Sequence, residues 1–211
     1  MTATRASTAT RGPDEAGARR QRRAQLLDAA DRVITRRGAG ASMDEIAAEA
    51  GISKPILYRH FRDKDGLHEA LAERYVDQLM GELQAAQVAG NARARIAAGI
   101  DAYLSFIERE PERYRFLLGA AEEPRTSALV ATFRRRLADN CAFATAERLR
   151  RAGLDPELAE PWAHGVVGMV RSVGIWWFET RSLPRERLVE QLTSILWDGL
   201  SALGAQAKQS G

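Results

Sequence analysis

Few residues of this 211-residue chain have types and spacings suited to catalysis or metal binding. The three histidines are His60, His68 and His164, and no two have the spacing usual for zinc ligands. No glycine-rich phosphate loop is present. The single cysteine, Cys141, lies in a helical stretch beside Ala142 and Phe143, so we expect a packing residue rather than a nucleophile. The sequence thus predicts no catalytic residue, no metal site and no cofactor, and an enzyme is disfavoured.

Side chains suited to binding nucleic acid are concentrated between positions 42 and 64. Hydroxyl, basic and aromatic groups alternate there: Ser42, Ser53, Lys54, Tyr58, Arg59, His60 and Lys64. Ser42 and Ser53 stand at expected helix N-termini, where hydroxyls and free N–H groups suit phosphate. Taken singly, Tyr58 is more typical of a half-buried packing residue, and His60 of a surface or capping residue. Their joint occurrence at these spacings favours contact with nucleic acid.

The distribution of charge along the chain also favours nucleic-acid binding by the N-terminal region. The whole chain has 31 Lys and Arg against 28 Asp and Glu, a net charge of +3 that indicates little. Residues 1–64 have 13 basic and 8 acidic side chains, and residues 65–211 have 18 and 20. A basic N-terminal third points towards nucleic acid or another anionic surface, the alternative being a solvated basic face.

The elements that must position these side chains are helices. Apolar residues recur at helical spacing almost everywhere after Arg19, and no segment alternates with a period of two, so the chain is predicted to be all-α with about nine helices. Their expected ranges are 19–37, 42–51, 53–61, 64–87, 91–110, a short one from 111, 127–152, 155–178 and 184–203. Residues 1–18 are expected to form a disordered arm. No membrane span or secretory signal is visible, and we expect a cytoplasmic protein.

A helix-turn-helix is predicted from the second and third of these helices. Ser42 and Glu45 form a capping box at the start of the second helix. Gly51 lies in the short turn between the two helices, where it can adopt the positive φ that reverses the chain. Ile46 and Leu57 are spaced to fill the angle between them. In such a pair the second helix enters the major groove of DNA, with Lys54 in the first turn, the end that meets base edges.

The run from Ser42 to Leu67, with its core of Leu57, Tyr58, His60, Phe61 and Lys64, resembles the DNA-binding domain of the tetracycline-repressor (TetR) family. The resemblance extends back to about Arg20. It implies that Lys54, Tyr58, His60 and Lys64 contact DNA backbone or bases, with Ser42 and Ser53 on phosphates. Pro55 and Ile56 depart from the small residue and the Thr or Ala common in the family, so the bases read are in doubt, and Ile56 is a candidate for contact with a thymine methyl.

The resemblance also implies two domains, a DNA-binding domain over 19–65 and a helical effector-binding and dimerisation domain over 66–211. All four tryptophans lie between positions 162 and 197, within apolar stripes of the last two long helices. From pattern alone such stripes are usually core. The family resemblance favours the alternative, in which these helices pair with their copies in a homodimer.

The expected effector pocket is lined by aromatic and aliphatic residues of the C-terminal domain, which suggests a small apolar ligand, possibly with an acyl chain. The candidates are Tyr103, Phe106, Tyr114, Phe116, Leu117, Phe133, Phe143, Trp162, Val166, Met169, Val170, Arg171 and Trp177. Arg171 is the charged member. It could bind a ligand carboxylate or phosphate, or make a structural salt bridge, which is the more common role for such a residue.

These observations predict a ligand-responsive transcriptional regulator, in the first instance a repressor, that binds a palindromic double-stranded DNA operator as a dimer and has no membrane partner. Arg19, Arg20, Arg22 and Arg23 are expected to add contacts to phosphate or the minor groove. A helical interaction protein that keeps the fold without binding DNA is the alternative class.

Overall fold

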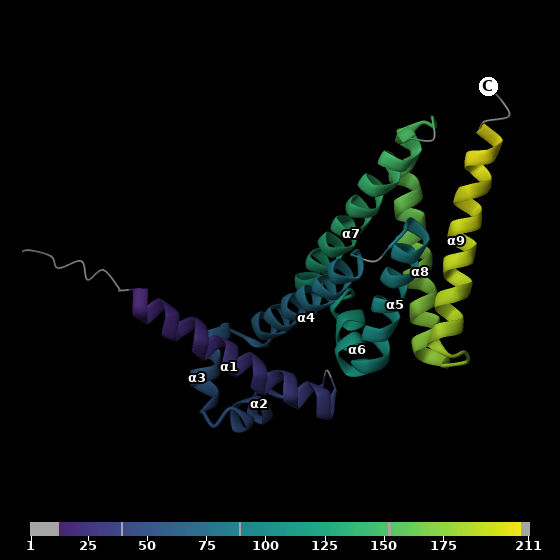
Figure 1. Cartoon of the computed structure of the whole chain (residues 1–211). Coiled ribbons are helices and arrows are strands. Elements are labelled where there is room, and N and C mark those ends of the chain that lie inside the picture. The colour runs from purple at the N-terminus through teal and green to yellow at the C-terminus, as the bar shows by residue number, and fades with distance from the viewer. Residues whose placement is uncertain (1–12, 39, 89, 152, 208–211) are drawn as a thin grey trace, which may run out of the picture. The chain divides into compact units, whose positions relative to one another are not determined.

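The computed structural model describes residues 13–38, 40–88, 90–151 and 153–207, and this part of the chain is helical with no strand. Figure 1 shows the elements in order. They are α1 (Pro13–Arg37), α2 (Met43–Glu49), α3 (Lys54–Phe61), α4 (Lys64–Ala86), α5 (Ala92–Arg109), α6 (Pro111–Ala120), α7 (Pro124–Arg151), the 3₁₀ turn η1 (Pro156–Leu158), α8 (Ala159–Thr180) and α9 (Arg185–Ala207). The predicted all-α class is confirmed.

Three helix starts differ from the sequence prediction. Helix α1 begins at Pro13, so residues 13–18 are helical rather than part of a disordered arm, while the rest of that expected arm, residues 1–12, lies outside the described residues. Pro13 is followed by two acidic residues, which suit a first helical turn. Helix α7 begins at Pro124 rather than near Ser127. Asp155 caps a 3₁₀ turn, and α8 begins after that turn.

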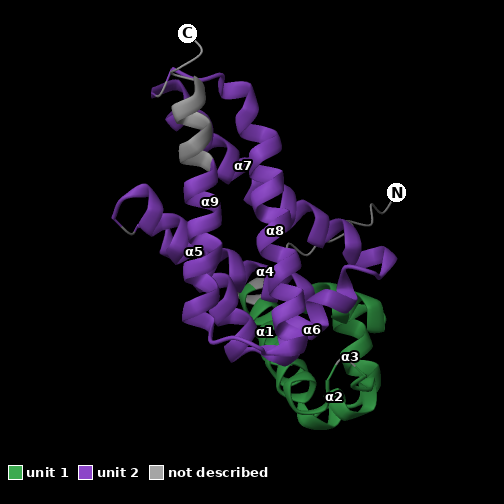
Figure 2. Ribbon diagram, turned by 90° about the vertical axis from the view of Figure 1, so that its right-hand side faces the viewer, with its two compact units in different colours: residues 1–71 green, residues 72–211 purple. Residues whose placement is uncertain are grey.

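The chain divides into two compact units, residues 1–71 and residues 72–211, drawn in different colours in Figure 2. The division lies within α4, after Leu71, which is seven residues beyond the first residue of the helix, Lys64. Helix α4 therefore contributes to both units. The first unit has a core in which α1, α2, α3 and the start of α4 each bury apolar side chains. Leu26, Ile34, Ile46, Leu57, Leu67 and Leu71 are all buried there.

In the second unit the long helices pack in two neighbouring pairs. Helix α8 packs along α7 and also contacts α5, and α9 packs along α5. The turn between α8 and α9 is stabilised by Trp177, whose indole Nε1 donates to the Leu183 carbonyl at 2.8 Å. Arg181 ends α8 in the left-handed conformation (φ 47°), with its guanidinium 4.4 Å from the Trp177 ring. The turn that joins α8 to α9 is therefore fixed by contacts of Trp177 and Arg181.

Candidate nucleic-acid interface

The start of α2 is fixed by its capping box, as the sequence predicts. The Glu45 backbone N–H donates to the Ser42 hydroxyl oxygen at 3.2 Å, and the Ser42 backbone N–H donates to Glu45 Oε2 at 2.9 Å. The Ser42 hydroxyl also donates to the same carboxylate oxygen at 3.0 Å. Hydrogen bonds from Ser42 lower the pKa of Glu45. Because the hydroxyl already has two partners in the cap, Ser42 has less capacity for a phosphate than the sequence suggests.

The turn between α2 and α3 is made at Gly51, which has a positive φ of 63°. The Ile52 N–H donates to the Ala47 carbonyl at 3.0 Å, so the chain reverses directly after α2. Leu57 and Phe61, one turn apart on α3, are then buried in the core. The arrangement is the predicted helix-turn-helix, in which the inward face of α3 is apolar.

The opposite face of α3 is open to solvent. Pro55 and Arg59, also one turn apart, are exposed, and Ile56 and Tyr58 flank them half-buried. Ser53, the residue before α3, is exposed and its hydroxyl makes no capping bond. This face therefore offers a hydroxyl, a guanidinium, a phenol and an apolar side chain on one short helix, the combination that reads groove edges and phosphates.

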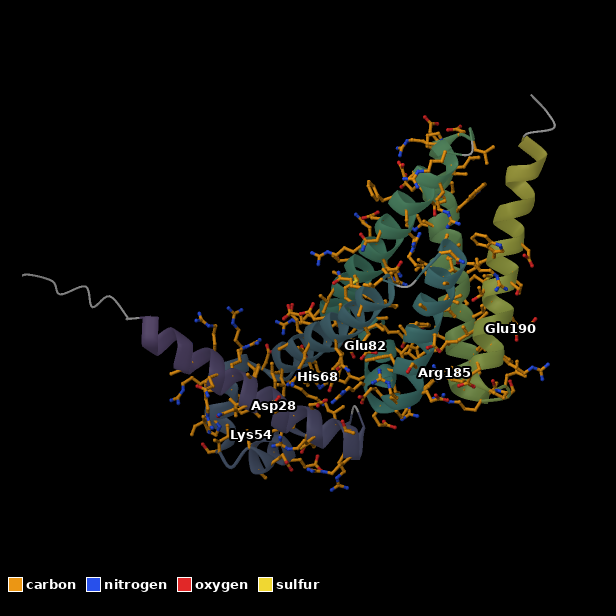
Figure 3. The ribbon with its side chains drawn as sticks, in the orientation of Figure 1. Asp28, Lys54, His68, Glu82, Arg185 and Glu190 are labelled. Atoms are coloured by element: carbon orange, nitrogen blue, oxygen red, sulfur yellow. The ribbon has the colours of Figure 1, made fainter. Side chains whose placement is uncertain are left out.

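Lys54, labelled in Figure 3, points to a partner that sequence reasoning missed. Its ammonium donates to Asp44 Oδ2 on α2 at 2.8 Å, and this contact raises the pKa of the lysine. The two residues are ten positions apart on different helices, so no helical periodicity relates them. The position of Asp44 beside the first turn of α3 makes it a further candidate at this interface.

His60 is half-buried at the end of α3, next to an arginine-rich surface. Burial is the main cause that lowers its pKa, followed by the positive charges of Arg59, Arg19, Arg22 and Arg23. The Arg23 guanidinium stacks 5.1 Å from the Phe61 ring. The basic residues of α1 and α3 therefore gather on one side of this unit, which is an electrostatic footprint for an anion such as DNA.

The corner between α3 and α4 places Lys64. Asp63 Oδ1 accepts the Gly66 N–H at 2.7 Å, which caps α4. Gly66 allows a close approach, because a Cβ there would lie 2.2 Å from the Phe61 carbonyl oxygen. Lys64 is exposed in the first turn of α4. The corner thus holds the lysine directly beyond the end of α3.

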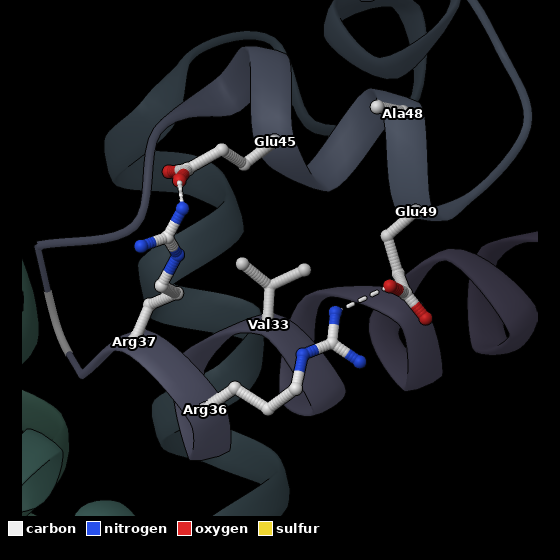
Figure 4. A pocket seen from close by; sticks show the side chains of 6 residues that line it. All are labelled: Val33, Arg36, Arg37, Glu45, Ala48 and Glu49. Carbon is white, nitrogen blue, oxygen red and sulfur yellow. Dashed lines mark hydrogen bonds and ion pairs between the residues drawn. The ribbon is translucent and has the colours of Figure 1, made fainter.

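A hollow of about 390 Å³ opens between α1 and α2, lined by Val33, Arg36, Arg37, Glu45, Ala48 and Glu49 (Figure 4). Arg37 pairs with Glu45 at 3.2 Å, and Arg36 pairs with Glu49. Arg32 also reaches Glu49 at 2.7 Å, and this contact is the largest cause that lowers the pKa of Glu49. The charges of the hollow compensate one another and join α1 to α2, so they indicate a structural role.

The effector candidates of the sequence analysis occupy different environments in the second unit. Five are buried: Phe106, Tyr114, Phe116, Leu117 and Trp177. Seven are half-buried: Tyr103, Phe133, Trp162, Val166, Met169, Val170 and Arg171. Phe143 is 79% exposed, so it does not line an interior pocket of this chain. Cys141, on the same helix, is half-buried, and burial raises the pKa of its thiol.

Tyr103 of α5 and Tyr114 of α6 form a hydrogen-bonded pair in that unit. Their hydroxyl oxygens lie 2.7 Å apart, and the Tyr114 ring meets the Phe178 ring edge-on at 5.2 Å between centroids.

Within the described ranges no group of His, Cys, Asp or Glu side chains is arranged to hold a metal ion. Among the described residues, no helix has the length and apolarity needed to cross a bilayer.

Comparisons with known proteins agree with this architecture. A model of the N-terminal domain of bacterial regulatory proteins of the tetR family matches residues 26–71, and one of the tetracyclin repressor-like C-terminal domain matches residues 80–211. The HTH-type transcriptional activator FasR of Mycolicibacterium smegmatis is 36% identical over 189 residues, which cover 87% of this chain and 84% of that protein.

Two further relatives support the same assignment. An uncharacterised HTH-type transcriptional regulator of Mycobacterium tuberculosis is 32% identical, covering 87% of this chain and 79% of its own. The crystal structure of a TetR-like transcriptional regulator from Rhodococcus superposes with a TM-score of 0.67 at 27% identity, covering 85% of this chain and 96% of that one. The chain therefore belongs to the TetR family, whose members are DNA-binding transcriptional regulators rather than enzymes.

Proposed function

We propose that this regulator binds a two-fold symmetric operator as a homodimer, with α3 of each subunit in the major groove, and that a small ligand of the C-terminal unit modulates the binding. The observation that carries the proposal is the solvent-exposed face of α3. It is held rigidly from behind by Leu57 and Phe61 and is bordered by Lys54, His60 and Lys64. A helix presented in this way can enter the groove without unfolding any of its core contacts.

Phosphate contacts are expected around this helix. Ser53 has a free hydroxyl at the start of α3, and Lys64 is exposed beyond its end. Arg19, Arg20, Arg22 and Arg23 are all exposed on α1. Contacts of this kind orient the protein on the duplex, while Pro55, Ile56, Tyr58 and Arg59 are the side chains placed to distinguish bases.

The exposed faces of α8 and α9 support a dimer. On α8 the exposed residues follow a helical stripe of mostly small side chains: Pro161, Gly165, Gly168, Ser172 and Trp176. A Cβ built on Gly165, Gly168 or Gly199 meets nothing within 4 Å, so another helix can approach closely there. Ile195 of α9 is 60% exposed. A two-fold dimer through these helices presents two copies of α3, as a symmetric operator requires.

The interior of the second unit supports an apolar effector. Aromatic and aliphatic side chains of α5, α6 and α8 dominate it, including Phe106, Phe116 and Trp177. Helix α4 continues from the first unit into the second without interruption. A ligand that prefers one arrangement of the second unit can therefore change DNA affinity through α4, by its difference in affinity for the two states, typically 1–3 kcal/mol.

The regulator could act on transcription in either of two directions, repression or activation. The family resemblance of the DNA-binding residues led us to expect a repressor. The Mycolicibacterium smegmatis relative is named a transcriptional activator, which favours activation for this chain. A reporter gene placed downstream of a bound DNA fragment distinguishes the two, because deleting the regulator raises expression in the first case and lowers it in the second.

The test of DNA binding uses fluorescence anisotropy with genomic DNA fragments and two variants. Tyr58→Ala and Lys64→Ala should weaken binding, by about 1–3 kcal/mol where a base contact is lost. Arg135→Gln, which removes an exposed charge from α7, is the matched control and should bind like the wild type. Light scattering should show that all variants keep the same oligomeric state. Unaltered binding of both Tyr58→Ala and Lys64→Ala would show that α3 is not the recognition surface.

A further inference from the structure

Arg171 of α8 is a half-buried cation whose charge is not compensated within the described part of the chain. No carboxylate there forms an ion pair with it, and no hydrogen bond from its guanidinium is present among those residues. Arg185 of the same unit, similarly placed between helices, pairs with both Asp101 and Glu108. The structural salt bridge considered for Arg171 is therefore not found. A guanidinium partly withdrawn from water is stabilised by an anionic partner.

The hydroxyl pair of Tyr103 and Tyr114 has an unused donor. Two hydroxyls 2.7 Å apart share one hydrogen bond, so one of them donates to the other and the second proton remains. No other described residue accepts that proton. Tyr114 is only 4% exposed, and burial is the main cause that raises the pKa of both tyrosines, so both stay protonated and able to donate at neutral pH. A buried donor of this kind points to an acceptor from outside the chain.

The cation and the hydroxyl pair lie on the same side of α8. Gly174 is the contact point, because a Cβ there would lie 2.5 Å from Tyr103 Cε1 and 3.1 Å from its hydroxyl oxygen. Arg171 lies three residues before Gly174 and Phe178 four residues after it, so the three share one helical face. Phe178 in turn meets the ring of Tyr114. Consistently, the positive charge of Arg171 acts on both tyrosines and lowers the pKa that burial raises.

We propose that Arg171 and the free O–H of the Tyr103–Tyr114 pair bind the anionic head group of the effector, a carboxylate or a phosphate monoester. The inference deepens the proposed ligand response and rests on it. A carboxylate or phosphate would accept from the guanidinium and from the tyrosine together, which satisfies both unpaired groups at once. The half-buried Val166, Met169 and Val170 precede Arg171 on α8 and provide apolar surface for the tail of the same molecule.

The test compares three probes with the same tail and different heads: decanoate, decyl phosphate and decanol, each below micelle-forming concentration. Isothermal titration of the full-length protein should show that at least one of the two anions binds 10- to 100-fold more tightly than the alcohol, as expected for a charge-assisted hydrogen bond. Comparison of decanoate with decyl phosphate identifies the head group. Arg171→Gln should remove the preference for the anion while retaining binding of decanol.

Two further variants keep the test informative if Arg171→Gln folds poorly. Arg171→Lys keeps the charge and should retain part of the preference, and Tyr103→Phe should reduce it because the hydroxyl pair is lost. Arg135→Gln on α7 is the matched control and should leave all three affinities unchanged.

Equal affinity of the wild type for anion and alcohol, or an anion preference that survives in Arg171→Gln, would overturn the head-group assignment. Failure of all three probes to bind would overturn it as well. Binding of decanol that changes DNA affinity, without any anion preference, would leave the proposed ligand response intact. Anion binding that leaves DNA affinity unchanged would instead contradict the proposed response while supporting the subsite.

Discussion

Lys54 at the start of the recognition helix is held by Asp44 of the preceding helix, with the ammonium 2.8 Å from Oδ2. Both side chains are exposed to water, so the pair contributes little to folding. We expect the pair to have a larger effect on DNA binding than on stability. The lysine is kept near the groove-facing end of α3, but its charge is offset until a phosphate or a base displaces the carboxylate.

Removing this carboxylate should strengthen DNA binding. Asp44→Asn frees Lys54 and removes a negative charge facing the duplex, so affinity for any DNA sequence should rise severalfold. The slope of log affinity against log salt should steepen by up to about 0.9 for each subunit, because one more phosphate is neutralised. Asp77→Asn, at an exposed position of α4, is the control and should change neither quantity. A weaker complex with Asp44→Asn would mean that the carboxylate itself contacts a base.

Replacing two glycines of α4 by alanine should change the stability of the protein in opposite directions. Gly66→Ala puts a Cβ 2.2 Å from the Phe61 carbonyl oxygen, a backbone atom that cannot move without shifting the α3–α4 corner, and should destabilise the protein by about 1–3 kcal/mol. Gly81→Ala meets nothing within 4 Å and should stabilise it by about 0.5–1 kcal/mol. Chemical denaturation of both variants measures these changes. Equal effects would show that the corner adjusts freely.

DNA binding should become tighter as the pH falls from 8 to 6. Burial, Arg59, Arg19, Arg22 and Arg23 hold the pKa of His60 below its usual 6.5, so the free protein has a neutral His60 at pH 7. A nearby phosphate favours the charged form, and binding then takes up a proton. The log of the association constant should rise by at most one per pH unit for each subunit. His60→Gln should flatten the profile, and a profile that stays unchanged in this variant would exclude His60 as the titrating group.

The same shift has the opposite effect on the stability of the free protein. Because the pKa of His60 is lowered on folding, the unfolded chain binds more protons below pH 6.5. The contribution of His60 to stability is therefore complete above that pH and decreases as the pH falls towards the pKa of the folded state. Thermal denaturation of wild type and His60→Gln at several pH values separates this effect from DNA binding.

The oligomeric state should depend on the exposed face of α9. Ile195→Arg places a charge at the centre of the proposed helix–helix interface and should convert the dimer into a monomer or weaken it strongly. Val88→Arg is the matched control, since Val88 is 88% exposed in the turn that follows α4 and belongs to no proposed interface. Sedimentation at several concentrations measures both. A stable dimer of Ile195→Arg would place the interface elsewhere.

Much of the fold follows from local sequence signals. The capping box at Ser42 and Glu45 and the positive φ of Gly51 were predicted and are present, and the caps that Asp63 and Asn91 provide in the structure are equally local. Each involves residues at most three positions apart, where the geometry depends on the local chain alone. The predicted start of α1 was wrong, although the sequence signal for the true start is also local. The Pro13-Asp14-Glu15 sequence was treated as part of a Thr- and Ala-rich arm.

Side-chain contacts between helices could not be predicted from the sequence. The Lys54–Asp44 pair and the Tyr103–Tyr114 hydroxyl contact depend on how separate helices approach, which spacing does not determine. Phe143 lies in an apolar stretch of α7 and was expected to line a pocket, but a long helix buries only the face that meets its neighbour. For Arg171 the sequence left two roles open, and only the packing around α8 shows which carboxylates are out of reach.

Selection of bound sequences from random double-stranded DNA tests whether two copies of α3 read a symmetric operator. We expect enrichment of an inverted repeat whose half-site centres lie about one helical turn, or a multiple of it, apart, and loss of that enrichment for Tyr58→Ala. Enrichment of an asymmetric single site, or no enrichment with a correctly folded protein, would contradict this expectation.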